Sequence, residues 1–145
     1  MSLLYKRVTL VVADIERSLT VYRDILGFTV NYIKDSAADS YSYPVFKIPK
    51  EAKIRFGALD SPTQERTIGL TEVKGYELPK SSAPMMSASV IKVEDLEAVM
   101  KKIEALGLET TEPEMDSNEY ADFKEQAFID FDGHLVVLYE LMLRE

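Results

Sequence analysis

The hydrophobic residues follow the same order twice along the chain. Residues 8–12 form a nearly continuous apolar and β-branched run, which predicts a strand buried on both faces. Asp14 follows as a helix N-cap. One helical face is then marked at spacings of four, three and four by Ile15, Leu19, Tyr22 and Leu26. Gly27 is expected to end this helix, and alternation from Phe28 predicts the next strand.

The second half repeats this pattern. Residues 88–93 predict a strand, and Glu94 and Asp95 open a helix that Gly107 ends. The closing strands also match, because TIGLTEV (67–73) resembles LVVLYEL (135–141) and places Glu72 opposite Glu140. Further strands are predicted over residues 53–59 and 123–129, the second followed by a turn at Gly133. Each half therefore predicts one βαβββ unit.

We predict an α+β fold of two paired βαβββ units, whose curled mixed sheets surround a cavity with the helices outside. Each sheet alone would expose an apolar face, so the two units need each other. The expected arrangement is a single domain over 1–145, with units at 5–73 and 85–142 and a linker at 74–84.

Two segments depart from the repeat. The longer first half has extra residues between Lys34 and Glu51, predicted as a long excursion or as an extra short strand around residues 44–48. The acidic stretch 109–125 is predicted as a solvated loop, with an acidic lid over a pocket as the alternative.

The composition excludes several classes of function. The chain has 145 residues, 25 acidic against 17 basic, and a net charge of −8, which disfavours nucleic acid and anionic membranes as partners. It has no cysteine, hence no disulfide or thiolate chemistry. No apolar run approaches the roughly 18 residues that cross a bilayer, and the first residues lack the features of a signal peptide, so we expect a cytoplasmic protein.

The segments VVADIERSLTVYRDILGF and FIDFDGHLVVLYEL, within the βαβββ repeat, resemble the vicinal oxygen chelate superfamily. This superfamily includes glyoxalase I, type I extradiol dioxygenases, and the bleomycin and fosfomycin resistance proteins. The resemblance covers essentially the whole chain. It implies that each half bends into a cup, and that in the metal enzymes His, Glu or Gln ligands point into the cavity from the first and last strands of each half.

Transferred onto this chain, the four ligand positions fall on Arg7, Gly69, Ala88 (Ser87 with a one-residue offset) and Val137. Arginine has no lone pair to offer, and the other three side chains have no donor atom for a metal. Moving the second position to Arg55 or to Glu72 does not recover three ligands. We therefore predict neither a metal nor another cofactor.

Arg7 is the most informative of these residues, since a buried guanidinium needs an anion. That anion is an internal carboxylate such as Glu72, or the carboxylate or phosphate of a ligand; otherwise Arg7 reaches solvent at the mouth of the strand. For Arg55 the alternatives are likewise the anion of a ligand, or a structural partner or solvent. The single histidine, His134, is interpreted as a turn residue. The predicted cavity wall consists of Arg7, Thr9, Arg55, Gly69, Thr71, Ala88, Val90, Val137 and Tyr139.

The favoured function is metal-independent binding of a small organic molecule with an anionic group, by a homodimer. The alternative is a lyase, isomerase or dioxygenase of the same superfamily, either metal-free or with an atypical metal site. In the metal-free form, Arg7 would hold an oxyanion, and Glu72 or a tyrosine would move a proton. A non-catalytic interaction module with a filled cavity is a third class. Whether the protein is an enzyme stays open at this point.

Overall fold

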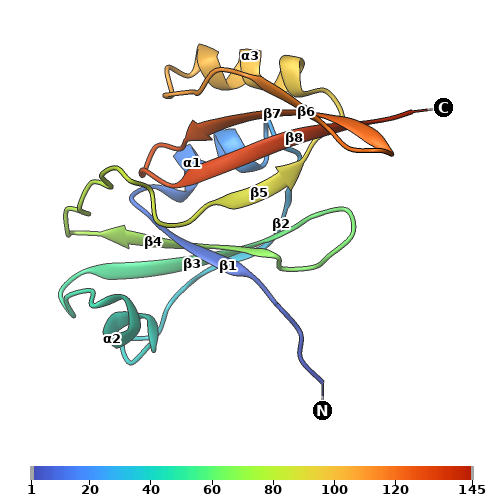
Figure 1. Cartoon of the computed structure of the whole chain (residues 1–145). Coiled ribbons are helices and arrows are strands. Elements are labelled where there is room, and N and C mark those ends of the chain that lie inside the picture. The colour runs from blue at the N-terminus through green and yellow to red at the C-terminus, as the bar shows by residue number, and fades with distance from the viewer. Residues whose placement is uncertain (1, 145) are drawn as a thin grey trace. The chain divides into compact units, whose positions relative to one another are not determined.

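A computed structural model describes residues 2–144 (Figure 1). Its elements are β1 (Val8–Val12), α1 (Ile15–Tyr22), β2 (Thr29–Asp35), α2 (Ser42–Phe46), β3 (Lys53–Asp60), β4 (Ile68–Lys74), β5 (Ser89–Lys92), α3 (Leu96–Ala105), β6 (Glu114–Ser117), β7 (Ala121–Ile129) and β8 (Leu135–Leu143). The chain divides into two compact units, Met1–Pro79 and Lys80–Glu145. Each unit contains one four-stranded sheet.

The two sheets have the same topology. In the first unit the strand order is β1-β4-β3-β2, and in the second it is β5-β8-β7-β6. The first and last strands of each unit pair in parallel, and the remaining neighbours are antiparallel. Each sheet is therefore mixed, as the repeated hydrophobic pattern predicts. This confirms the α+β fold class with two βαβββ units.

The helices α1 and α3 begin at the predicted aspartates. A side-chain oxygen of Asp14 accepts a hydrogen bond from the Arg17 N–H at 3.2 Å, and Asp95 accepts one from the Ala98 N–H at 3.1 Å. The counterpart of Asp14 is thus Asp95 rather than Glu94. Among the described residues, no helix is long and apolar enough to cross a membrane.

The two glutamates of the repeat each bind the first residue of the helix in their own unit. Glu72 Oε2 accepts a hydrogen bond from the Ile15 N–H at 2.8 Å, and Glu140 Oε1 accepts one from the Leu96 N–H at 2.9 Å. Each carboxylate satisfies a backbone donor that the helix itself cannot satisfy, and its charge opposes the positive end of the helix dipole. The match between TIGLTEV and LVVLYEL therefore reflects a shared strand-to-helix contact.

Each sheet has one face covered by its helix. In the first unit α1 packs on β4, and in the second unit α3 packs on β7 and β8. The fully buried large residues include Ile15, Leu19, Val21, Tyr22, Leu96, Ile103, Phe128, Val136 and Leu138. Burying each such side chain stabilises the fold by about 1.5–3 kcal/mol.

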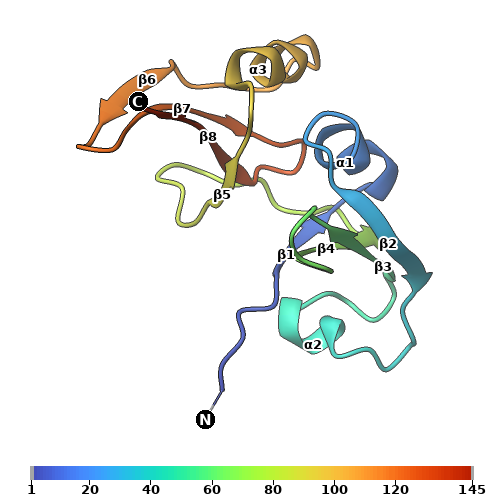
Figure 2. The same cartoon turned by 90° about the vertical axis from the view of Figure 1, so that its right-hand side faces the viewer.

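The extra segment of the first unit does not form the strand predicted around residues 44–48. It forms the short helix α2, which lies on the opposite side of the first sheet from α1 (Figure 2). Tyr43 is buried there, and its hydroxyl donates a hydrogen bond to the Ala52 carbonyl at 2.8 Å. Pro44 is tolerated because it stands in the first turn, where its missing N–H has no helical partner.

The acidic segment is not entirely a loop either. Residues 114–117 form β6, which pairs antiparallel with β7 from Glu114↔Glu125 to Ser117↔Asp122. All four β6 residues are exposed. An edge strand of this kind has no buried apolar face, so hydrophobic alternation could not predict it.

Candidate functional site

The site is built on the face of the first sheet opposite α1. A Cβ on Gly57 would lie 3.7 Å from Ile15 Cδ1, so Gly57 faces α1. Side chains alternate along a strand and paired residues share a face, so Thr9, Gly69 and Thr71 point to the other side. We call this the α2 face, because α2 and the segment after it cover one end of it. The α2-face residues of β1, β3 and β4 are Thr9, Val11, Ile54, Phe56, Ala58, Gly69, Thr71 and Val73.

An apolar cluster closes one end of the α2 face. Tyr43 and Ile48 pack with Ile54 and Val73, and Val11 and Leu78 pack against them. These residues belong to the core of the first unit and are not free for a ligand. The rest of the face lies toward the half-buried Thr9 and the buried Gly69.

Phe56 fills the space above Gly69. A Cβ on Gly69 would lie 2.8 Å from both Cε1 and Cζ of Phe56 and 3.0 Å from Thr9 Oγ1. Real Cβ atoms do not approach other atoms at 2.8 Å, so Gly69 is required while the Phe56 ring keeps this place. The second transferred ligand position thus lacks a donor and is covered by an aromatic ring.

Two cationic side chains gather around the neighbouring aromatic residue, Tyr32. The centroids of the Tyr32 and Phe56 rings are 6.0 Å apart, with the planes tilted by 49°. Lys34 Nζ lies 5.4 Å and Arg66 Cζ 5.8 Å from the centroid of the Tyr32 ring. Such cation–π contacts hold positive charge beside an aromatic surface.

Arg66 is fixed by its backbone. Its φ of +53° lies in the left-handed region, which costs a residue with a side chain about 1 kcal/mol or more. Its N–H donates to Asp60 Oδ1 at 2.8 Å, and its carbonyl accepts from Arg7 Nε at 3.1 Å. Arg7, Lys34 and Arg66 have no ion pair with a carboxylate within residues 2–144.

Thr71 lies beside Phe56 in the sheet and is fully buried. Its Oγ1 has no hydrogen-bond partner among the described residues. A buried hydroxyl without a partner costs about 1–3 kcal/mol, so most proteins avoid one. An unsatisfied hydroxyl between Gly69 and Val73 therefore marks this part of the α2 face as a place where a polar group of a ligand would be stabilised.

Arg55 does not join this group. It pairs in register with Glu72, on the α1 side of the sheet. Its Nε lies 3.2 Å from Glu72 Oε1, and its second terminal nitrogen 3.2 Å from Oε2, with Glu16 at 4.0 Å. The hydrogen bond to Glu72 raises the pKa of Arg55. Glu72 is thus the partner of Arg55 and not of Arg7, because Arg7 faces the same side as Thr9.

The predicted residues of the second unit occupy the corresponding positions of its sheet. Val137 pairs with Val90 and with Ala127, and it faces away from α3 together with Tyr139. Val90 is 64% exposed, and Ala88 directly precedes β5. Apart from the Tyr139 hydroxyl, these side chains offer a ligand no polar group.

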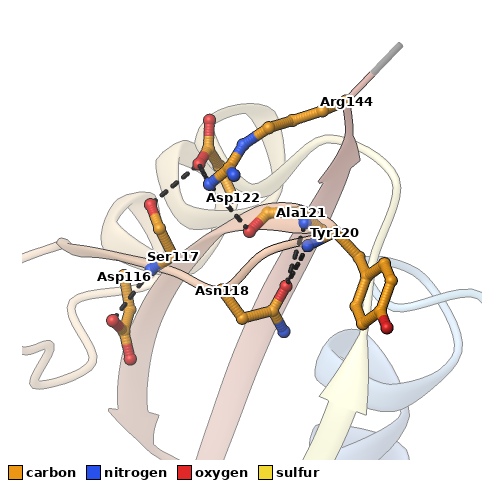
Figure 3. Close-up of polar contacts among 7 residues, drawn as sticks. All are labelled: Asp116, Ser117, Asn118, Tyr120, Ala121, Asp122 and Arg144. Atoms are coloured by element: carbon orange, nitrogen blue, oxygen red, sulfur yellow. Dashed lines mark hydrogen bonds and ion pairs between the residues drawn. The ribbon is translucent and has the colours of Figure 1, made fainter.

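The most concentrated polar contacts of the second unit lie at the turn between β6 and β7 (Figure 3). Asp122 accepts hydrogen bonds from Arg144 at 2.7 Å and from Ser117 Oγ at 2.8 Å, and both lower its pKa. Asn118 Oδ1 accepts from the Tyr120 N–H at 2.8 Å. These bonds fix the exposed turn and pair Asp122, one of the acidic residues of the stretch 109–125.

No set of metal ligands converges in the described part of the chain. Within residues 2–144, no three His, Cys, Asp or Glu side chains gather closely enough to hold a metal ion. His134 lies in the turn between β7 and β8, where its backbone N–H donates to Asp130 Oδ1 at 2.9 Å. The turn placement of His134 agrees with the interpretation from sequence.

Sequence reasoning missed Tyr32, Lys34, Phe56 and Arg66. One signal pointed toward Phe56, because a glycine inside a strand often marks the close approach of another group, and Gly69 is such a glycine. Arg66 follows a polar loop and carries no sequence signal for its left-handed backbone.

Comparison with known proteins identifies the family. The Glyoxalase/Bleomycin resistance protein/Dioxygenase superfamily matches residues 5–138, and the chain belongs to this superfamily. No curated protein matches the sequence.

Solved structures share the fold at low sequence identity. A glyoxalase family protein from Bacillus cereus has a TM-score of 0.77 at 14% identity, over 98% of this chain and 96% of that one. A glyoxylase/bleomycin resistance protein/dioxygenase domain from Frankia sp. has a TM-score of 0.64 at 18% identity, over 100% and 95%. The fosfomycin resistance protein FosX from Listeria monocytogenes, complexed with Mn(II) and sulfate, has a TM-score of 0.62 at 18% identity, over 97% and 93%.

Proposed function

We propose that the protein binds a small organic anion on the α2 face of the first sheet, without a metal. One observation carries this proposal: Lys34 and Arg66 both lie over the Tyr32 ring without an ion pair to a carboxylate within residues 2–144, in a chain with a net charge of −8. With an excess of acidic side chains available, two unpaired cations beside one aromatic ring favour an external anion.

The cations and the hydroxyl groups would bind different parts of the ligand. Arg66 and Lys34 supply charge beside Tyr32 on β2, and Arg7, which precedes the opposite edge strand β1, donates a hydrogen bond to the Arg66 carbonyl. Thr71 provides a hydrogen-bonding group next to Phe56. A carboxylate or phosphonate would meet the cations, and a polar substituent would reach a threonine.

The position of Phe56 supports metal independence. A side chain at position 69 that reached a metal would have to pass through the Phe56 ring. Arg7, at the first transferred position, would repel a cation. The residues present therefore do not fit a metal of the kind that the resemblance implies.

A relative supplies a parallel. One FosX structure from Listeria monocytogenes contains Mn(II) and 1S,2S-dihydroxypropylphosphonic acid, which is a small organic anion. That protein holds its anion together with a metal. In this chain we propose that arginine supplies the positive charge.

A metal-free isomerase or lyase receives less support. It needs a mobile proton carrier, and Glu72 is bound by the Ile15 N–H and by Arg55 on the far side of the sheet. The homodimer, the cytoplasmic location and the pairing of the two units into one domain remain predictions.

The proposal is tested by NMR titration of the ¹⁵N-labelled protein with propylphosphonate and with cyclohexanecarboxylate in the presence of EDTA. We expect saturable shifts at the amides of Thr9, Gly69 and Thr71. Arg66→Ala and Arg7→Ala should each weaken binding about tenfold, because each removes a charge-assisted contact. Lys102→Ala, which removes an exposed charge from α3, is the matched control and should change nothing.

Two outcomes would contradict the proposal. One is the absence of saturable binding by either anion. The other is binding that EDTA abolishes, or that persists at full strength in both arginine variants, because the anion would then sit on a metal or at another place.

A further inference from the structure

We propose that the ligand carries a planar aromatic ring, which lies against Phe56 while its anionic group meets Lys34 and Arg66. This inference rests on the proposed function and narrows it to one chemical class, aromatic carboxylates and their phosphonate analogues.

Phe56 is a half-buried aromatic residue of the α2 face. Its ring leans over Gly69, with the Thr9 side chain beside the same glycine. Ala58, the next α2-face residue on β3, adds only a methyl group. Ala58 and Gly69 are buried and Phe56 is half-buried, so the exposed part of the Phe56 ring is the surface on which a flat group would lie.

The two ends of the surface differ in polarity. Toward Ile54 and Val73 the face is closed by the buried Tyr43 and Ile48. Toward Tyr32 it ends in the cations Lys34 and Arg66. A ligand that fits this gradient has its ring over Phe56 and its charge at the Tyr32 end, which is the layout of an aryl carboxylate.

Aromatic character also suits the electrostatics better than an aliphatic ring of equal size. Stacked or tilted aromatic pairs gain energy beyond the area they bury, and the Tyr32–Phe56 pair already provides two rings at 6.0 Å. Substituents on such a ring that accept or donate a hydrogen bond come near Thr9 and Thr71. Thr71 is fully buried, so a substituent reaches its Oγ1 only after neighbouring side chains move.

The test compares two probes of equal charge and similar size, 2-naphthoate and decahydronaphthalene-2-carboxylate, by isothermal titration calorimetry in EDTA. We expect 2-naphthoate to bind about five- to tenfold more tightly. Phe56→Leu should weaken 2-naphthoate about fivefold and leave the saturated probe unchanged. Phe56→Met is a second variant that replaces the ring by a flexible, unbranched side chain, and Tyr120→Leu, at an exposed tyrosine of the second unit, is the matched control.

The possible failures are distinguishable. If both probes bind equally and Arg66→Ala weakens both, the anion site stands and the aromatic ligand class is wrong. If 2-naphthoate binds more tightly than the saturated probe, but neither Phe56 variant changes its affinity and both variants remain folded by circular dichroism, the ligand ring does not lie on Phe56. The inference then fails. If neither probe binds although propylphosphonate does, the inference fails alone; if no anion binds, the proposed function fails with it.

Discussion

The two units of this protein share a frame and differ in what they place on it. In both, an aspartate caps the helix after the first strand, and a glutamate of the last strand binds the first helical N–H. The shared frame explains why the repeat is visible in sequence. It uses few residue types, and each is required by an unsatisfied backbone group.

The faces turned away from α1 and α3 are where the units differ. Through the register of the strands, Thr9 and Gly69 correspond to Val90 and Val137. Phe56 corresponds to Glu125, since they pair with Thr71 and Tyr139 respectively. The first unit thus has two threonines, a glycine and a phenylalanine where the second has two valines, a glutamate and a tyrosine. The side chains on these faces can differ between the units because they take no part in the helix-cap hydrogen bonds that both units share.

The largest expected effect concerns the two glutamates. Glu72→Ala should lower the free energy of unfolding by about 3 kcal/mol, because it leaves a buried helical N–H unsatisfied and removes the partner of Arg55. Glu140→Ala should lower it by about 1 kcal/mol, because Glu140 is half-buried and loses one hydrogen bond. Urea unfolding followed by circular dichroism measures both.

Glu97→Ala provides the control for the glutamate pair. Glu97 forms an exposed ion pair with Lys101 at 3.6 Å, which is worth about 0.5 kcal/mol or less. Equal losses for Glu72→Ala and Glu140→Ala would show that Arg55 adds nothing and that the two helix contacts are equivalent.

The next effect comes from adding bulk at corresponding positions. Gly69→Ala should destabilise by about 1–2 kcal/mol, because its Cβ would meet the Phe56 ring at 2.8 Å. Val137→Ile, at the half-exposed counterpart, should change stability by less than about 0.5 kcal/mol. Combining Gly69→Ala with Phe56→Leu should recover part of the loss. A tolerated Gly69→Ala with an unmoved Phe56 ring would contradict the packing described here.

The sequence predicted the strands and helix starts that the two units share better than it predicted the side chains on the sheet faces turned away from α1 and α3. Strands β1, β3, β4, β7 and β8 and the helix starts follow from apolar periodicity and capping residues. The edge strand β6 and the helix α2 did not follow, because one has no buried face and the other owes its place to Tyr43 and Ile48 packing on the sheet. These are tertiary effects, which override local propensity.

The arginines show the same limit at the site. Of the partners suggested for Arg7, the internal carboxylate Glu72 is bound by Arg55 on the other face. Alternation assigns Arg55 and Glu72 to faces only after the pairing of β3 with β4 is known, and a shift of one residue would reverse the assignment. Register was the missing information.

A smaller effect is expected at the connections before the last strand of each unit. The first has Arg66 at φ +53° and the second has Gly133 at φ +89°. A left-handed backbone conformation is thus adopted by a residue with a side chain in one unit and by glycine in the other. Arg66→Gly should leave the free energy of unfolding unchanged or raise it by up to about 1 kcal/mol, since glycine adopts this conformation freely. It should nevertheless weaken binding of propylphosphonate, as Arg66→Ala does. A variant that loses stability and keeps binding would assign Arg66 a structural role only.

The smallest expected effect is the pH dependence of the turn between β6 and β7 in the second unit. Thr71 and Phe56 of the first unit carry no ionisable group, so they have no corresponding effect. Hydrogen bonds from Arg144 and Ser117 hold the pKa of Asp122 below its ordinary value of 3.8. A lowered pKa means that the ionised form is favoured in the folded protein, so this contribution is present above the ordinary pKa and is lost as the pH falls through the lowered one. Both groups are exposed, so the change in global stability is small. Carboxyl ¹³C NMR should therefore detect Asp122 titrating below pH 3.8, and Arg144→Ala should raise its pKa toward the ordinary value. An unchanged titration in Arg144→Ala would mean that the ion pair drawn in Figure 3 does not persist in solution.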